Sequence, residues 1–254
     1  MRTTLTALAV LAAAVPAAAQ DYHFTRDIPT GGRLEISNIT GNIDVTRATG
    51  RTAEISVTKT VRRGDGTLVK AIMEESGSTV HVCTIYLTRD PNRHTCNGDN
   101  NNSSRGDNVQ VDMHYTVRVP GGVELVVDDV IGNVTASGTD TDVKLETVTG
   151  DISFDGSGAT SLETVNGKIV ARFSRADWEG SMSVNTVNGS LELTFPASLS
   201  ADVKGETVNG SIESDFPITV EKGFGPKSFS GRIGSGGRRL SLETVNGSIT
   251  LRKR

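Results

Sequence analysis

A ten-residue phrase recurs along the second half of this chain, and it constrains the fold more than any other feature. The phrase reads SLETVNGSIT near the C-terminus, and its variants are KLETVTGDIS, SLETVNGKIV, SVNTVNGSLE and KGETVNGSIE. A unit this short cannot bury its own apolar face, so such repeats are typical of a solenoid in which neighbouring coils complete one another's core. The central glycines of the copies lie 16 to 22 residues apart, at Gly132, Gly150, Gly167, Gly189, Gly210, Gly231 and Gly247.

Two copies depart from the regular pattern. The copy at Gly231 reads SFSGRIGS and is degenerate, and an outlying copy, EISNITGNIDV, lies far upstream at Gly41. Apart from that copy, the stretch from Gln20 to about Pro120 shows the repeat only weakly and resembles longer strands, such as the alternating segment VQVDMHYTVRV.

The residue types of the repeat predict β-strands. Val, Ile, Thr and Leu dominate it, glycine punctuates it, and apolar residues recur at even spacing, as at Val165 and Ile169. Leu162 and Val165 lie three residues apart, so we expect the coil to bend between them or to bulge at Asn166-Gly167. The predicted fold class is all-β: a single-stranded β-solenoid, or β-helix, with coils of about 16–22 residues and an irregular β-rich N-terminal half.

The Asn-Gly pair of the phrase predicts one corner per coil, because both residues tolerate positive φ. Coils that stack at about 4.8 Å would align the corner asparagines into a hydrogen-bonded ladder, interrupted at Ser230, and would stack the preceding valines likewise. Each coil would then be the template for the next coil along the chain. The predicted ladder comprises Asn166, Asn188, Asn209 and Asn246, and the valines are Val148, Val165, Val187, Val208 and Val245.

The same stacking aligns acidic residues and threonines. A row of glutamates, interrupted at Asn185 and Lys227, is either a solvated outer face that discourages aggregation or a stripe that holds divalent cations or a basic surface. The second interpretation makes the row the candidate binding face. Its members are Glu146, Glu163, Glu206 and Glu243, beside an expected polar row of Thr147, Thr164, Thr186, Thr207 and Thr244.

The N-terminus and the charge indicate where the protein works. Residues 1–19 have the layout of a signal peptide, with one early arginine, an apolar run and small residues before Gln20. We therefore expect an exported protein, periplasmic or extracellular at the cell surface, with no integral membrane segment after cleavage. The net charge of −4 argues against a nucleic-acid partner. The predicted organisation is a signal peptide (1–19), a β-rich region (20–120) and a repetitive solenoid (121–254).

Two cysteines are present, and each follows a histidine by two positions. In an exported chain, Cys83 and Cys96 are expected to form a disulfide. The alternative is a zinc site that adds His81 and His94. A disulfide would tether the base of NGDNNNSSRGDN (residues 97–108), which is a surface loop by composition.

Catalytic motifs are not found in the sequence. The nearest carboxylate cluster is Asp128 and Asp129, with Asp140 and Asp142 close behind, and it supports an alternative function as a polysaccharide-binding or polysaccharide-cleaving β-helix enzyme. Trp178, the sole tryptophan, lies in an insertion that either covers the core or offers an aromatic platform for a sugar.

These features resemble a known family. A signal peptide, front strands that include VHVCTIYLTRDPNRHTC and YTVRVPGGVELVV, and serial ETVNGSI coils are similar to the bacterial putative adhesin family, domain of unknown function 4097. The resemblance implies a surface or adhesive role and transfers no catalytic or ligand residues. We therefore expect a non-enzymatic, adhesin-like scaffold of the cell envelope, without cofactor or metal, that makes multivalent contacts with an envelope glycan or surface protein. Self-association through open strand edges is a further possibility.

Overall fold

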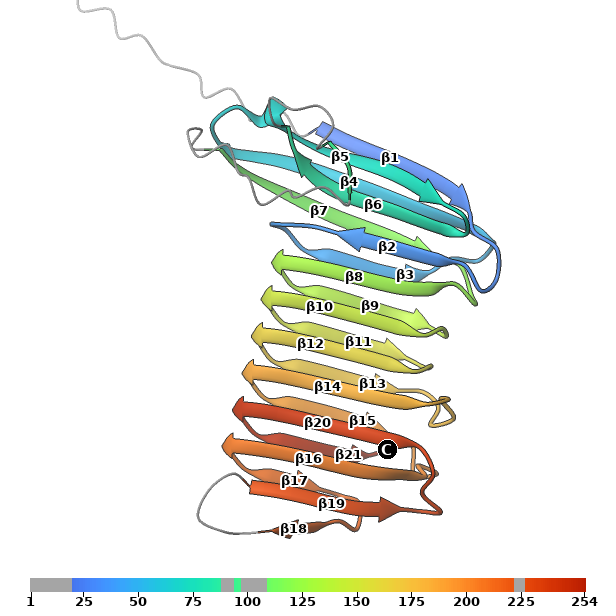
Figure 1. Cartoon of the computed structure of the whole chain (residues 1–254), viewed down its shortest axis with the longest axis vertical. Helices are drawn as coiled ribbons and strands as arrows, with labels where there is room; N and C mark the ends of the chain where they lie inside the picture. Colours follow the sequence, from blue (N-terminus) through green and yellow to red (C-terminus); the bar gives the residue numbers. More distant parts are fainter. Residues whose placement is uncertain (1–19, 88–93, 97–108, 222–226) are drawn as a thin grey trace, which may run out of the picture.

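The computed structural model describes residues 20–87, 94–96, 109–221 and 227–254. The predicted signal peptide and the loop at 97–108 lie outside these ranges. The chain is all-β, and its strands form two sheets in which most neighbours are parallel (Figure 1). Among the described residues, no helix is both long and apolar enough to span a membrane.

The two sheets, called A and B here, have ten and eleven strands. Sheet A has the spatial order β1 (Gln20–Asp27), β4 (Thr52–Arg63), β7 (Gln110–Val119), β3 (Ile43–Arg47), β9 (Val134–Thr139), β11 (Ile152–Gly156), β13 (Ile169–Phe173), β15 (Leu191–Phe195), β21 (Ile249–Lys253) and β17 (Ile212–Ser214). Sheet B has the order β18 (Thr219–Glu221), β19 (Lys227–Ile233), β16 (Ala201–Asn209), β20 (Arg239–Asn246), β14 (Ser181–Asn188), β12 (Thr160–Asn166), β10 (Val143–Thr149), β8 (Glu124–Ile131), β2 (Arg33–Ser37), β6 (Thr79–Tyr86) and β5 (Val69–Ser76). A short 3-10 helix, η1 (Gly66–Leu68), precedes β5.

From β8 to β15 the chain alternates between the sheets, and each coil contributes one strand to each. Strands of successive coils pair in parallel with equivalent residues opposite each other, as at Leu145 and Leu162. Along β12, burial alternates without a break, with Leu162 and Thr164 inside and Glu163 and Val165 outside. The expected bend between Leu162 and Val165 is therefore not present, because a threonine rather than the valine takes the inward position. At Asn166-Gly167 the strand ends and the chain bends into the corner.

The glycine of each corner is required by the neighbouring coil. A Cβ atom on Gly167 would lie 1.9 Å from the carbonyl oxygen of Gly150, and one on Gly247 would lie 1.8 Å from that of Gly189. Neither Gly167 nor Gly247 has a positive φ. The sequence prediction placed glycine at a corner for its backbone freedom, and Gly41 (φ 128°) and Gly150 (φ 156°) do use it, but the corner glycines also allow two backbones to stack closely.

The last coil does not stack at the end of the chain's own series. In sheet B, β20 lies between β14 and β16, and in sheet A, β21 lies between β15 and β17 (Figure 1). The expectation that each coil is the template for the next is therefore wrong here, because the C-terminal segment returns to fill a gap between two earlier coils. Gly231 also leaves the series, since β19 runs antiparallel to β16 and pairs Gly231 with Val203.

The N-terminal end is also assembled from distant segments. The upstream copy at Gly41 stacks on the copy at Gly132, with Gly41 N–H donating to the Ile131 carbonyl at 2.9 Å. Beyond this coil of β2 and β3, β7 pairs in parallel with β3 and β6 pairs in parallel with β2. Antiparallel strands then close the stack: β4 and β1 in sheet A, and β5 in sheet B. Cys83 and Cys96 form a disulfide at this end, with their Cα atoms 5.5 Å apart.

The core lies between the two sheets and runs through the whole stack. Aliphatic side chains from successive coils stack in rows, and a few aromatic rings fill one side of the space. Phe173 and Phe195 stack with ring centroids 4.5 Å apart, and Trp178 contacts Phe195 at 6.0 Å. Because Trp178 is only 4% exposed, it covers the core and is not an aromatic platform.

Candidate binding face on sheet B

The outer face of sheet B carries four rows of side chains that cross the strands. A strand alternates between inside and outside, so every second residue of each coil reaches this face. From strand start to strand end, the rows are here called the basic row, the serine row, the acidic row and the valine row. The basic row is Ser181, Arg239, Asp202 and Arg232; the serine row is Lys144, Ser161, Ser183, Ser241, Lys204 and Ser230; the acidic row is Asp128, Glu146, Glu163, Asn185, Glu243 and Glu206; the valine row is Val130, Val148, Val165, Val187, Val245 and Val208.

The acidic row contains the four glutamates predicted from the sequence. Glu146 pairs with Glu163, and Glu206 pairs with Glu243, while Asn185 stands between the two pairs. The expected interruption at Lys227 does not occur, because Lys227 pairs with Thr207 on β16. Glutamates thus lie on neighbouring strands along the face, where their charges repel one another and would favour a cationic partner.

The valine row is exposed. Its six side chains lie outside the core, and their exposed fractions range from 38% at Val165 to 44% at Val148. Isolated exposed valines are unremarkable, but six of them at the same position of six neighbouring strands make a continuous apolar stripe.

The predicted threonine row is inside the protein. Thr186 donates its hydroxyl hydrogen to the carbonyl oxygen of Gly167 at 3.0 Å, and Thr244 donates to that of Gly189 at 2.9 Å. The expectation that these threonines form an exposed binding row was wrong, because the hydroxyl satisfies a corner carbonyl of the adjacent coil. Equivalent bonds are made by Thr147, Thr164 and Thr207.

Asp129 occupies the threonine position in its coil. It pairs with Thr147, is 5% exposed, and neither of its carboxylate oxygens has a hydrogen-bond partner within the described residues. Burial raises the pKa of Asp129 to about 7, although the nearby Asn38 side chain and Val130 N–H favour the charged form. A protonated Asp129 resembles the threonines, because it has a hydroxyl hydrogen to donate.

The carboxylates of the alternative enzymatic hypothesis do not form one site. Asp128 points outward in the acidic row, where burial and then a hydrogen bond with Glu146 raise its pKa to about 6. Asp129 points inward, so the two groups lie on opposite faces of the sheet. Asp140 pairs with Arg47, and Asp142 accepts from the Ala159 N–H. The geometry required of a pair of catalytic carboxylates flanking one bond is not met.

The corner asparagines form a chain of side-chain hydrogen bonds next to the valine row. Asn188 donates to Asn166 at 2.9 Å, Asn246 donates to Asn188 at 2.8 Å, and Asn209 donates to Asn246 at 2.8 Å. The order of the hydrogen-bonded asparagines therefore follows the spatial order of the coils. Ser230 does not take part in this series of hydrogen bonds, because it belongs to antiparallel β19.

The zinc alternative is not supported by the cysteines, since both are consumed by the disulfide. His81 contacts Ser37 at 2.8 Å through Nε2, and its Nδ1 lies 3.7 Å from a Glu35 oxygen. Burial lowers the pKa of His81, and the nearby Glu35 and Glu74 carboxylates oppose this effect.

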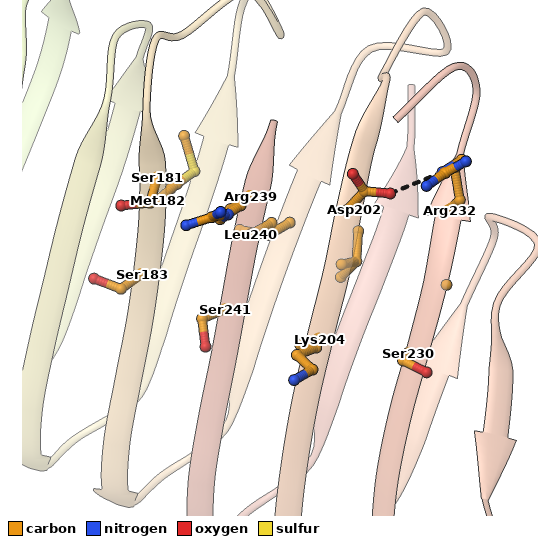
Figure 2. A pocket seen from close by; sticks show the side chains of 12 residues that line it. Ser181, Met182, Ser183, Asp202, Lys204, Ser230, Arg232, Arg239, Leu240 and Ser241 are labelled. Carbon is orange, nitrogen blue, oxygen red and sulfur yellow. Dashed lines mark hydrogen bonds and ion pairs between the residues drawn. The ribbon is translucent and has the colours of Figure 1, made fainter. Parts of the chain in front are cut away.

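Three adjoining hollows lie on this face near its C-terminal end. The largest, here called the basic hollow, has a volume of about 720 Å³ and spans the basic and serine rows of β14, β20, β16 and β19. Figure 2 shows Arg239 between Ser181 and Asp202, with Arg232 beyond them. A second hollow shares Ser241, Lys204 and Ser230 with the first, and a third lies over the acidic and valine rows.

The sequence analysis missed the basic hollow. Its cations come from three different segments: Arg239 lies just upstream of one copy of the phrase, Lys204 opens another copy, and Arg232 lies in the degenerate copy. A comparison of the copies position by position gives only a weak signal, because Lys204 stands where two copies have Ser161 and Ser241 but a third has Lys144.

The fold and this face define a class of protein: an all-β repeat protein with an extended outer face. The chain belongs to the Toastrack DUF4097 family, whose model matches residues 29–252. No curated protein matches the chain.

Several solved structures are similar to this one over nearly its whole length. A "putative cell adhesion protein" from Clostridium sporogenes has 8% identity and a TM-score of 0.47, covering 92% of this chain and 100% of its own. A "putative adhesin" from Bacteroides fragilis has 13% identity and a TM-score of 0.37, covering 94% and 100%. A "putative lipid binding protein" from Parabacteroides distasonis has 10% identity and a TM-score of 0.27, covering 93% and 98%.

Proposed function

We propose that the chain is a non-enzymatic, exported cell-envelope protein whose β-solenoid presents the outer face of sheet B to an extended partner, as an adhesin-like scaffold. The partner class is an envelope glycan or a surface protein. The observation that carries the proposal is that the three hollows adjoin one another on one face of one sheet. A face with repeated rows can make many weak contacts whose effects combine along an extended ligand.

The sequence and the disulfide support the proposed location. Residues 1–19 are interpreted as a signal peptide. The Cys83–Cys96 bond requires an oxidising compartment to persist. Both features support a periplasmic or surface-exposed protein.

The test is co-sedimentation of the chain from Gln20 onward with isolated peptidoglycan, outer membrane and surface polysaccharide. The binding face is blocked by two bulky substitutions on neighbouring strands, Ser183→Trp with Ser241→Trp. The matched control blocks sheet A with Thr194→Trp and Thr250→Trp, since all four side chains are half-buried.

We expect saturable binding to one fraction that the sheet B variant abolishes and the sheet A variant retains. Absence of binding to every fraction, or loss of binding only in the sheet A variant, would contradict the proposal.

A further inference from the structure

We propose that the basic hollow binds the acidic groups of an anionic carbohydrate polymer that lies across the strands of sheet B. This inference rests on the proposed function above and names its ligand class.

The charge of the hollow is the first argument. Arg239, Lys204 and Arg232 contribute three positive charges, whereas Asp202 contributes one negative charge. Asp202 is already satisfied, because it pairs with Arg232 at 2.9 Å and accepts from the Gly237 N–H at 3.0 Å. The hollow is therefore a positive site on a chain with a net charge of −4.

The second argument is that two of these cations make no close polar contact, although Arg239 is near enough to Asp202 to add to the Gly237 N–H in lowering the pKa of that carboxyl. Within the described part of the chain, the side chains of Arg239 and Lys204 make neither a hydrogen bond nor an ion pair. Both face the same hollow, Arg239 from the basic row and Lys204 from the serine row (Figure 2). An arginine can bind a carboxylate or phosphate through two parallel hydrogen bonds, and a lysine can add a point charge beside it.

The serines point to a hydroxyl-rich ligand. Ser181, Ser241 and Ser230 line the hollow, and their hydroxyls make no hydrogen bond to other described side chains. A hydroxyl group both donates and accepts, so these serines suit the hydroxyl groups of a sugar.

The surroundings distinguish a carbohydrate from other polyanions. The exposed large apolar residues of the described chain lie at the opposite ends of the strands, as Val187 and Val245 do, and none lines the hollow. Met182, Val203 and Leu240 line the hollow from the core side but are at most 2% exposed, so an acyl chain of a lipid would find little exposed apolar side chain there. A nucleic acid needs a broad positive field, and the acidic row opposes that field.

The geometry also gives the direction of the polymer. Arg239 and Arg232 lie on strands that are separated by β16, so they are about 10 Å apart along the stack if strands are spaced by about 4.8 Å. A polymer that runs along the basic row meets both cations, with Asp202 between them and paired with Arg232. A polymer that follows the strands would instead meet the acidic row. Repeated acidic groups thus favour the orientation across the strands.

The test measures binding of the chain from Gln20 onward to polygalacturonate, a linear polymer with a carboxylate on each sugar. The first control ligand is the same polymer with its carboxylates methyl-esterified. The test variant is Lys204→Gln with Arg239→Gln, and the matched variant is Lys168→Gln with Arg172→Gln, which removes one exposed lysine and one exposed arginine outside the hollow.

We expect saturable binding to the acidic polymer, weakened about tenfold or more by the test variant because charged hydrogen bonds are lost. The matched variant should stay within about twofold of the unaltered chain, since exposed charges contribute little individually. Equal binding of the esterified polymer would overturn the inference. So would full competition by inorganic phosphate at equal anion concentration, or binding to phosphatidylglycerol vesicles without binding to the polymer.

The outcomes separate the inference from the proposed function. If an envelope fraction binds through sheet B but polygalacturonate does not, the inference fails and the proposed function stands. If no envelope fraction binds, the proposed function fails as well.

Discussion

The middle and the C-terminal end of the stack are built from the same repeat, but they are ordered differently. From β8 to β14, the order of strands in sheet B follows the order of the chain. Beyond β14 the order becomes β20, β16 and β19, because the last coil returns between two earlier ones. The repeated phrase therefore determines the shape of a coil, but not which coil lies beside it, since every coil offers an equivalent edge.

This difference has a functional consequence. The phrase keeps the acidic row, the valine row and the asparagine corner nearly constant, whereas the residues that precede it vary. Insertion of β20 brings Arg239 between Ser181 and Asp202. Both of these residues are distant from Arg239 in the sequence. The basic hollow therefore exists only because the coil order changes at this end.

The largest expected effect comes from removing the inserted coil. Deletion of residues 239–254 removes four buried aliphatic side chains, Leu240, Leu242, Ile249 and Leu251, each 0–1% exposed. At about 2 kcal/mol for each side chain, the loss of about 8 kcal/mol is comparable to the whole stability of an ordinary domain. Urea unfolding followed by circular dichroism should show no cooperative transition.

The control for this deletion is a chain that ends at Leu251, which keeps all four side chains and should unfold cooperatively. A cooperative transition of normal midpoint in the longer deletion would show that the inserted coil is dispensable.

The second effect is the pH dependence of stability that arises from Asp129, which occupies a position of the inward threonine row. The pKa of Asp129 is about 7 in the folded protein, compared with an ordinary value of 3.8. The unfolded chain therefore loses this proton at lower pH than the folded protein does, and stability falls as pH rises from about 4 to about 7. The difference amounts to about 4 kcal/mol, and it stays constant above pH 7, where both states are ionised.

The measurement is the free energy of unfolding by urea between pH 4 and pH 8, for the unaltered chain and for Asp129→Asn. The amide has no acidic proton and can donate to a carbonyl oxygen, so the variant should be less dependent on pH and more stable at pH 8. Parallel pH profiles for the two proteins would show that Asp129 does not titrate as described.

The third effect is the loss of stability on breaking the disulfide at the N-terminal end. Cys83 and Cys96 are 13 residues apart in sequence, and closing a loop of this size contributes about 3 kcal/mol. Reduction with dithiothreitol should lower the free energy of urea unfolding by this amount. The double variant Cys83→Ala with Cys96→Ala should no longer respond to the reductant, and an equal response would assign the effect to something other than this bond.

The smallest effect compares two adjacent residues of one middle coil. Thr186→Val removes the hydroxyl that bonds the Gly167 carbonyl, and should cost about 1–2 kcal/mol. Val187→Thr changes an exposed residue of the valine row and should stay within about 0.5 kcal/mol. Urea midpoints of the two variants measure the difference, and a reversed order would contradict the inward and outward assignment.

Much of the fold could be predicted from the repeat. The β-branched residues and the regular glycines indicated stacked strands. The two cysteines of a chain expected to be exported indicated a disulfide, which is present. The order of the last coils could not be predicted, because SLETVNG occurs both at Ser161 and at Ser241 and fits either position equally well. Only the packing of the whole chain decides between such neighbours.

The inward and outward assignment was harder to predict than the strands. Thr164 and Val165 are adjacent, and apolarity alone favours the valine as the inward residue. The hydrogen bond from Thr164 to the Gly150 carbonyl reverses this preference, because a buried carbonyl without a donor is costly. A candidate binding row of threonines was therefore placed on the wrong side of the sheet.

The C-terminal coil lies between two earlier coils and so completes the basic hollow. Paired cysteine substitutions at the asparagine corners test it directly. Neighbouring strands are about 4.8 Å apart, within the Cα separation that a disulfide spans, whereas strands two places apart are beyond its limit of about 7 Å.

The measurement is mass spectrometric mapping of disulfides after mild oxidation of Asn188→Cys with Asn246→Cys, and of Asn188→Cys with Asn209→Cys. We expect a bond in the first pair and none in the second, because Asn188 pairs with Asn246, which in turn pairs with Asn209. A bond between positions 188 and 209, without one between 188 and 246, would show that the coils follow the order of the chain and would remove the structural basis of the hollow.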